Sequence, residues 1–113
     1  MVCISLSDAP IRSPSISPTG TQTYNETNTV TLTCTLTEDG NPPAVWSWIC
    51  NNQPMSPGQI TTIQKGSKLT FPATKDRNGH RCYCRATSPV TSYDRTSTFV
   101  TFNIQCKYQL LYV

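Results

Sequence analysis

The sequence has little of what would indicate a helical, membrane-spanning or catalytic protein. Of its 113 residues only 13% are charged and 36% hydrophobic, both below the globular average. No apolar run is long enough to cross a membrane, and no segment repeats apolar residues with the period of an amphipathic helix. The chain has one histidine, His80, and no glycine-rich phosphate-binding loop. These absences favour a non-catalytic, strand-rich domain.

Cysteine is the abundant exception. Six cysteines in a short chain favour three disulfides and an oxidising compartment. The sequon Asn25-Glu26-Thr27 agrees, because Asn25 can carry an N-linked glycan only on a secreted or cell-surface protein. We therefore expect an extracellular location. The end of the chain, residues 107–113, has no polar tail, which favours a segment of a larger ectodomain over a separately secreted protein.

Several short segments carry the alternation of a half-buried strand. In the clearest, Val30, Leu32 and Cys34 face one way and threonines the other, as in a sheet with one buried face. Residues 1–22 hold three prolines and are expected to form an edge strand broken by proline or an extended linker. A polar turn is expected at 24–28. The other predicted strands are 45–50, 59–64, 68–71, 81–87 and 96–105, so that about seven strands predict a two-sheet sandwich.

Three residues carry a family resemblance. Cys34 in an alternating strand, Trp48 in the next strand, and Cys84 after the turn that begins at Asp76 resemble an immunoglobulin-like domain. The resemblance covers residues 10–106 and leaves 1–9 and 107–113 as extensions or linkers. The short spacing from Cys34 to Cys84 is similar to that of the constant-like or intermediate sets in adhesion and receptor ectodomains. It leaves no room for the extra hairpin of variable-type domains.

The resemblance implies a disulfide pattern. Cys34 and Cys84 would join the two sheets, with Trp48 packed on the bond. Cys82 stands where the family usually has a tyrosine. Cys50 lies two residues after the tryptophan, on a strand that in this family neighbours the strand of Cys82, so the resemblance implies a second bond, Cys50–Cys82.

Cys3 and Cys106 are then left over. They pair with each other, or each pairs outside this chain; the sequence leaves both alternatives open.

A zinc site and a cysteine nucleophile are two other chemistries that the cysteines of this chain could serve. His80, Cys82 and Cys84 with Cys50 have the composition of a Cys3His zinc site, but zinc needs reduced thiols and leaves Cys34 and Trp48 unexplained. A cysteine nucleophile beside His80 would lack a second general base in a matching context. We therefore expect no metal, no cofactor and no enzymatic activity, and we place His80 exposed at a turn.

The candidate binding residues are basic or aromatic. Arg81 and Arg85 alternate with the cysteines of their strand, so we expect a basic pair that points outward from the sheet. The loop 88–95 carries Tyr93 and Arg95, residue types enriched in binding hot spots, and the loop 37–44 is a further candidate surface.

The predicted function is extracellular recognition of a protein ligand, or of a same-type domain, in cell adhesion or innate immune recognition. A structural spacer and a module for acidic, heparin-like glycans are the alternatives, the latter because residues 65–113 are basic. Nucleic acid is not expected as a partner, since aromatics do not interleave with the basic residues, and no segment is expected to insert into a membrane.

Overall fold

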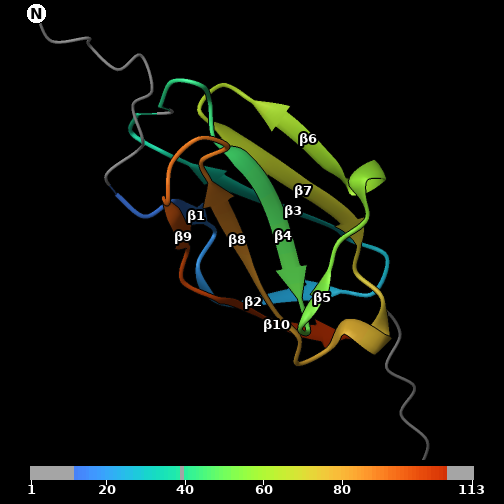
Figure 1. Ribbon diagram of the computed structural model, residues 1–113. Coiled ribbons are helices and arrows are strands. Elements are labelled where there is room, and N and C mark those ends of the chain that lie inside the picture. Colours follow the sequence, from blue (N-terminus) through green and yellow to red (C-terminus); the bar gives the residue numbers. More distant parts are fainter. Residues whose placement is uncertain (1–11, 39, 107–113) are drawn as a thin grey trace, which may run out of the picture.

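The computed structural model describes residues 12–38 and 40–106, and in this part of the chain it is an all-β sandwich (Figure 1). The strands are β1 (Ser15–Ser17), β2 (Gly20–Asn25), β3 (Thr29–Thr35), β4 (Val45–Cys50), β5 (Gln53–Pro54), β6 (Ile60–Ile63), β7 (Gly66–Pro72), β8 (Arg81–Thr87), β9 (Asp94–Thr96) and β10 (Val100–Gln105). Two short 3-10 turns, η1 (Pro57–Gln59) and η2 (Lys75–Arg77), interrupt them. The predicted sandwich is confirmed, with ten strands instead of about seven, because three of the additional strands have only two or three residues.

The strands form two sheets that face each other. One sheet has the order β1-β3-β7-β6, and the other β2-β10-β8-β4-β5, with β9 paired to β8. In Figure 1 strand β4 lies in front and β3 behind it, so the view is onto the outer face of the six-stranded sheet. Every pairing is antiparallel except that of β2 with β10, which is parallel.

The chain passes from one sheet to the other between its first two strands. β1 pairs with β3 in one sheet and β2 with β10 in the other, and Pro18 lies between them, where its missing N–H breaks the ladder. Of the two alternatives for residues 1–22, the structure therefore has the edge strand broken by proline in residues 12–22, and residues 1–11 lie outside the described part of the chain. β2 continues to Asn25, so the turn expected at 24–28 is limited to Glu26 and Thr27.

Trp48 and two disulfides lie at the centre of the core. Cys34 in β3 bonds to Cys84 in β8 across the two sheets, with Cα atoms 6.5 Å apart. Trp48 is fully buried in the same cluster, and its indole N–H donates a hydrogen bond of 2.9 Å to the hydroxyl of Ser67. Buried indole groups need such a partner, which explains why the only buried polar side chain among the described residues is this serine.

The second disulfide lies within the six-stranded sheet. Cys50 of β4 and Cys82 of β8 are directly opposed in the antiparallel ladder and are bonded, with Cα atoms 4.2 Å apart. These are the two pairings that the resemblance implied. Cys106 is exposed and has no disulfide partner within residues 12–38 and 40–106. Cys3 lies outside the described residues, so the Cys3–Cys106 bond stays a prediction.

Candidate recognition surface

Strand β8 separates an inward face from an outward face. Cys82, Cys84 and Ala86 are buried, whereas Arg81 and Arg85 are exposed. Both arginines therefore lie on the outer face of the six-stranded sheet, as the alternation predicted.

The two arginines do not form a free basic pair. The guanidinium of Arg85 donates to both carboxylate oxygens of Asp94, at 2.8 Å from Nε. This contact lowers the pKa of the Asp94 carboxyl and raises the pKa of Arg85. The expected basic pair is therefore not present. Arg81 has no ion pair within the described residues, whereas the charge of Arg85 is neutralised by Asp94 of β9.

A bulge interrupts the last strand before Val100. Residues 96–105 were expected to form one strand, but Thr96 pairs with Arg85 and Val100 with Cys82. Four steps along the last strand therefore match three along β8, which leaves one extra residue at 97–99. Bulges of this kind redirect side chains. The hydroxyl of Ser97 accepts the amide N–H of Cys84 at 3.1 Å and so satisfies a donor left free at the interruption.

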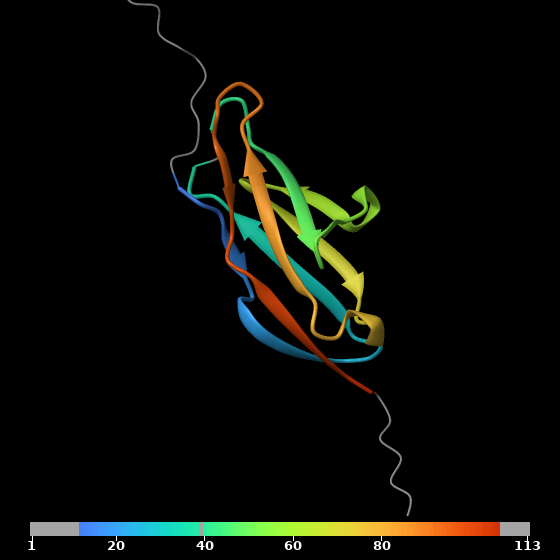
Figure 2. The same ribbon diagram turned by 60° about the horizontal axis from the view of Figure 1, so that its bottom comes forward.

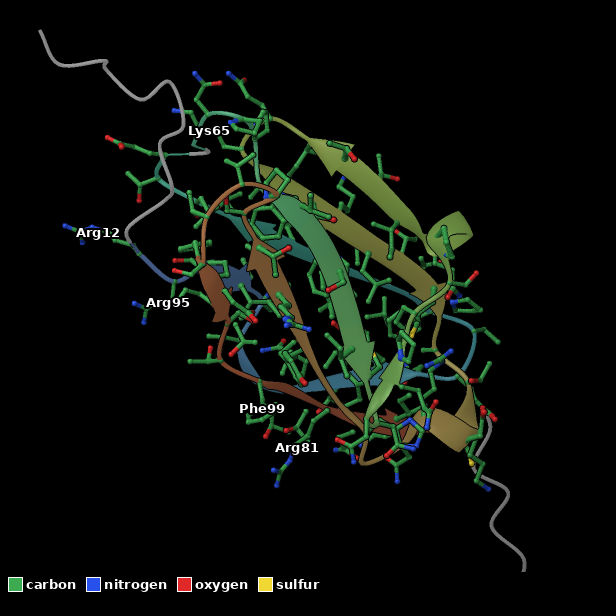
Figure 3. The ribbon with its side chains drawn as sticks, in the orientation of Figure 1. Arg12, Lys65, Arg81, Arg95 and Phe99 are labelled. Atoms are coloured by element: carbon green, nitrogen blue, oxygen red, sulfur yellow. A yellow bond between two sulfur atoms is a disulfide. The ribbon has the colours of Figure 1, made fainter. Side chains whose placement is uncertain are left out.

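Phe99 directly precedes the buried Val100, so it points to the outer face, and it is 51% exposed. Its ring meets the ring of Tyr83 edge to face, with centroids 5.4 Å apart. The guanidinium carbon of Arg81 lies 5.6 Å from the Phe99 centroid, within the range of a cation–π contact. Figure 3 shows the side chains of Arg81 and Phe99 together at the end of the sheet. The sequence analysis named Arg81 but neither Tyr83 nor Phe99, although alternation with the buried Cys82, Cys84 and Val100 is a signal that places both on the outer face.

A shallow hollow of about 280 Å³ adjoins the cluster. Its lining combines the aromatic cluster with the turn between β4 and β5: Asn51, Asn52, Gly79, Arg81, Tyr83 and Phe99. Asn51 and Asn52 both have left-handed backbones, with φ of 50° and 62°, as a two-residue hairpin turn requires. No acidic residue lines the hollow.

The two loops proposed as binding surfaces lie at the opposite end of the six-stranded sheet. The loop between β3 and β4 and the loop between β8 and β9 project from one end of the sandwich (Figures 1 and 2). The Tyr93 hydroxyl donates to the backbone carbonyl of Arg12, and partial burial raises the pKa of Tyr93. Arg95 belongs to strand β9 instead of the loop, and it is exposed. Val90, 55% exposed, is the large apolar residue that this loop presents.

His80 differs from expectation. It is half-buried instead of exposed, and its Nδ1 atom is buried with no hydrogen-bond partner in the described part of the chain. It lines a second hollow, of about 320 Å³, with Arg77 and Met55 among its neighbours. Arg77 is already engaged, because its guanidinium lies 4.5 Å from the centroid of Phe71.

The three cysteines that a zinc site with His80 would need all lie in the two disulfides. They therefore offer no thiolate ligand to accompany His80. Within residues 12–38 and 40–106 no three metal-ligating side chains of histidine, cysteine, aspartate or glutamate gather in one place.

Asn25, the predicted glycosylation site, ends strand β2 at the edge of the six-stranded sheet and is exposed. Its backbone N–H donates to the side chain of Asn28, which closes the turn that follows. The glycan itself stays a prediction.

The fold, the disulfide across the sheets and the buried tryptophan together define an immunoglobulin-type domain. The family model of the immunoglobulin domain matches residues 13–102. The chain belongs to the immunoglobulin domain family. In the part of the chain that the structure describes, no helix is long and apolar enough to cross a membrane.

Solved structures agree on the fold. The first two domains of Rst match at 17% identity with a TM-score of 0.71 over 85% of this chain. The N-terminal Ig1-2 module of the Drosophila receptor protein tyrosine phosphatase DLAR matches at 20% identity with a TM-score of 0.63 over 87%. This chain covers half of each of those two chains. Titin domain M7 matches at 13% identity and 0.64, with 89% of this chain and 98% of the other covered. No curated protein sequence matches at a significant level.

Proposed function

We propose that this domain is an extracellular, non-catalytic recognition module that binds a protein partner, or a same-type domain, through the outer face of its six-stranded sheet. The observation that carries the proposal is the cluster of exposed Arg81, half-buried Tyr83 and exposed Phe99 on that face. Aromatic and arginine side chains are enriched in binding hot spots. The two disulfides support an oxidising compartment.

Two variants test this assignment. Each adds an N-glycosylation site to one sheet, and we call the added glycan a wedge because it blocks the surface around it. Gln105→Thr completes a sequon with Asn103, which is exposed on β10 in the six-stranded sheet. Thr31→Asn completes one with Thr33 on the outer face of the other sheet. Both proteins, made as multimers in a secreting cell line, would be screened against a panel of cell-surface ectodomains. We expect a partner of the parent that tolerates the Thr31→Asn wedge and is lost with the Gln105→Thr wedge.

The opposite pattern would place binding on the four-stranded sheet. No partner in the panel, together with strictly monomeric sedimentation over a concentration series, would favour the spacer function.

Binding of an acidic glycan is the second candidate, supported by exposed arginines without an ion pair among the described residues, Arg12, Arg81 and Arg95. Figure 3 shows Arg12 and Arg95 extending from the side of the sandwich. Retention of the parent on a heparin column, lost in the triple glutamine variant of these arginines, would support it. Elution of the parent in the void volume would contradict it.

A further inference from the structure

We propose that the hollow beside the Asn51–Asn52 turn is a carboxylate-binding subsite. It would take an aspartate or glutamate side chain of a protein partner, while an apolar side chain of the same partner packs on Phe99. This inference deepens the proposed recognition function and rests on it.

The first argument is a fixed and unpaired cation. The guanidinium carbon of Arg81 lies 5.6 Å from the centroid of the Phe99 ring, and the ring of Tyr83 meets that ring edge to face. No carboxylate within residues 12–38 and 40–106 forms an ion pair with Arg81. A held guanidinium loses less rotamer freedom when it meets a carboxylate, and such pairs form strong, two-pronged hydrogen bonds.

The second argument is the chemistry of the remaining lining. Asn51 and Asn52, whose side chains carry amides, and Tyr83, whose side chain carries a hydroxyl, line the hollow. None of these groups has a hydrogen-bond partner within the described residues. Gly79, with φ of 82°, closes the hollow without a side chain, and nothing lies within 4 Å of where a Cβ would stand. A carboxylate offers four acceptor positions, which fits a hollow lined with free donors and no acid.

The third argument concerns the surroundings of the hollow. Ile49 lies directly opposite Tyr83 in the ladder between β4 and β8 and is half-buried. Ile49, Tyr83 and Phe99 therefore form an apolar band beside the donors. A partner that fits both features presents a carboxylate next to an apolar side chain, as a protein surface does.

The distribution of charge disfavours a sulfated glycan at this subsite. A polyanion needs several free cations in a row. The next arginine along β8, Arg85, is neutralised by Asp94. Arg95 pairs with Ala86, five residues from Arg81 along β8, which is about 16 Å away at the rise of a strand.

The experiment uses small probes and the whole domain. Acetyl-Leu-Glu-Leu-amide, its glutamine counterpart and a heparin-derived tetrasaccharide would each be titrated into the ¹⁵N-labelled protein. We expect the glutamate peptide to shift the amide signals of Asn51, Arg81 and Phe99 in a saturable way, with binding at least about tenfold tighter than that of the glutamine peptide. Added salt should weaken it, because the subsite is open to solvent.

Two variants with the same change of charge complete the design. Arg81→Gln should weaken glutamate-peptide binding about tenfold. Lys68→Gln, on the outer face of the other sheet, should leave it within about twofold, since a distant exposed charge is screened. Equal melting temperatures would show that both variants are folded.

Several results would overturn the subsite. These are equal shifts with the two peptides, saturable shifts with the tetrasaccharide alone, or no saturable shift up to about 20 mM peptide, beyond the millimolar range of weak binding. Failure of the subsite is distinguishable from failure of the recognition function. If the Gln105→Thr wedge abolishes binding of a partner and Arg81→Gln does not, recognition by this face stands and the carboxylate subsite falls.

Discussion

Removing the Cys50–Cys82 disulfide should lower the stability of the domain by about 4 kcal/mol. The bond closes a loop of 32 residues, for which the chain-entropy relation gives about 3.7 kcal/mol at 25 °C. The Cys34–Cys84 bond already shortens the path between the same residues in the unfolded chain, which reduces this to about 3 kcal/mol. Both cysteines are buried, so replacing them with alanine adds about 1 kcal/mol of lost packing.

The assay is urea unfolding of the Cys50→Ala/Cys82→Ala variant beside the parent, followed by tryptophan fluorescence. A loss of about 4 kcal/mol corresponds to a fall of roughly 15–30 °C in the melting temperature of a domain of this size. Since the constraint acts on the unfolded chain, most of the loss should appear as slower folding. A loss below about 1 kcal/mol, or one confined to faster unfolding, would refute the reasoning.

Three further changes test the core and the surface. Ser67→Ala leaves the buried N–H of Trp48 unpaired and should cost about 1–3 kcal/mol in urea unfolding; an unchanged midpoint would contradict this. Gly66→Ala brings a Cβ into the backbone carbonyl of the neighbouring strand and should destabilise by about 3 kcal/mol or more, or prevent secretion. Asp94→Asn should destabilise at neutral pH. The pKa of Asp94 is lowered by Arg85 in the folded state, so this loss should vanish as the pH falls well below about 3.9; a loss independent of pH would exclude the ion pair as its cause.

The sandwich fold could be predicted from the sequence because the strongest sequence signals for it are local. Alternation around Leu32 predicts one wet and one buried face, and β3 has that pattern of burial. The two expected disulfides follow from the family frame, in which alternation and strand order place Cys50 opposite Cys82. Trp48 packs where the resemblance put it, fully buried beside the bond across the sheets.

The candidate site was less predictable, because its contacts join segments that are far apart in the sequence. A bulge at residues 97–99 changes which side chains of the last strand face outward. Ser97 fits the bulge through its hydroxyl, but a serine in a Ser- and Thr-rich stretch gives no distinctive signal. The same limit applies to Arg85, since only the course of β9 shows that Asp94 reaches it. Contacts between distant segments decide such details, and periodicity does not encode them.

The second disulfide and the proposed subsite are parts of one structure. Cys50 directly precedes the Asn51–Asn52 turn, and Cys82 lies between Arg81 and Tyr83 on β8. The amide of Asn51 donates to the carbonyl of Arg81 at 3.0 Å, so the covalent bond and this hydrogen bond fix the two walls of the hollow relative to each other. Cys82 stands where the family usually has a tyrosine. The Cys50–Cys82 disulfide therefore takes the place of that tyrosine's tertiary contact, and it lies beneath the exposed donors. Because preorganised donors lose less entropy on binding, the Cys50→Ala/Cys82→Ala variant, kept folded at low temperature, should bind the glutamate peptide more weakly than the parent.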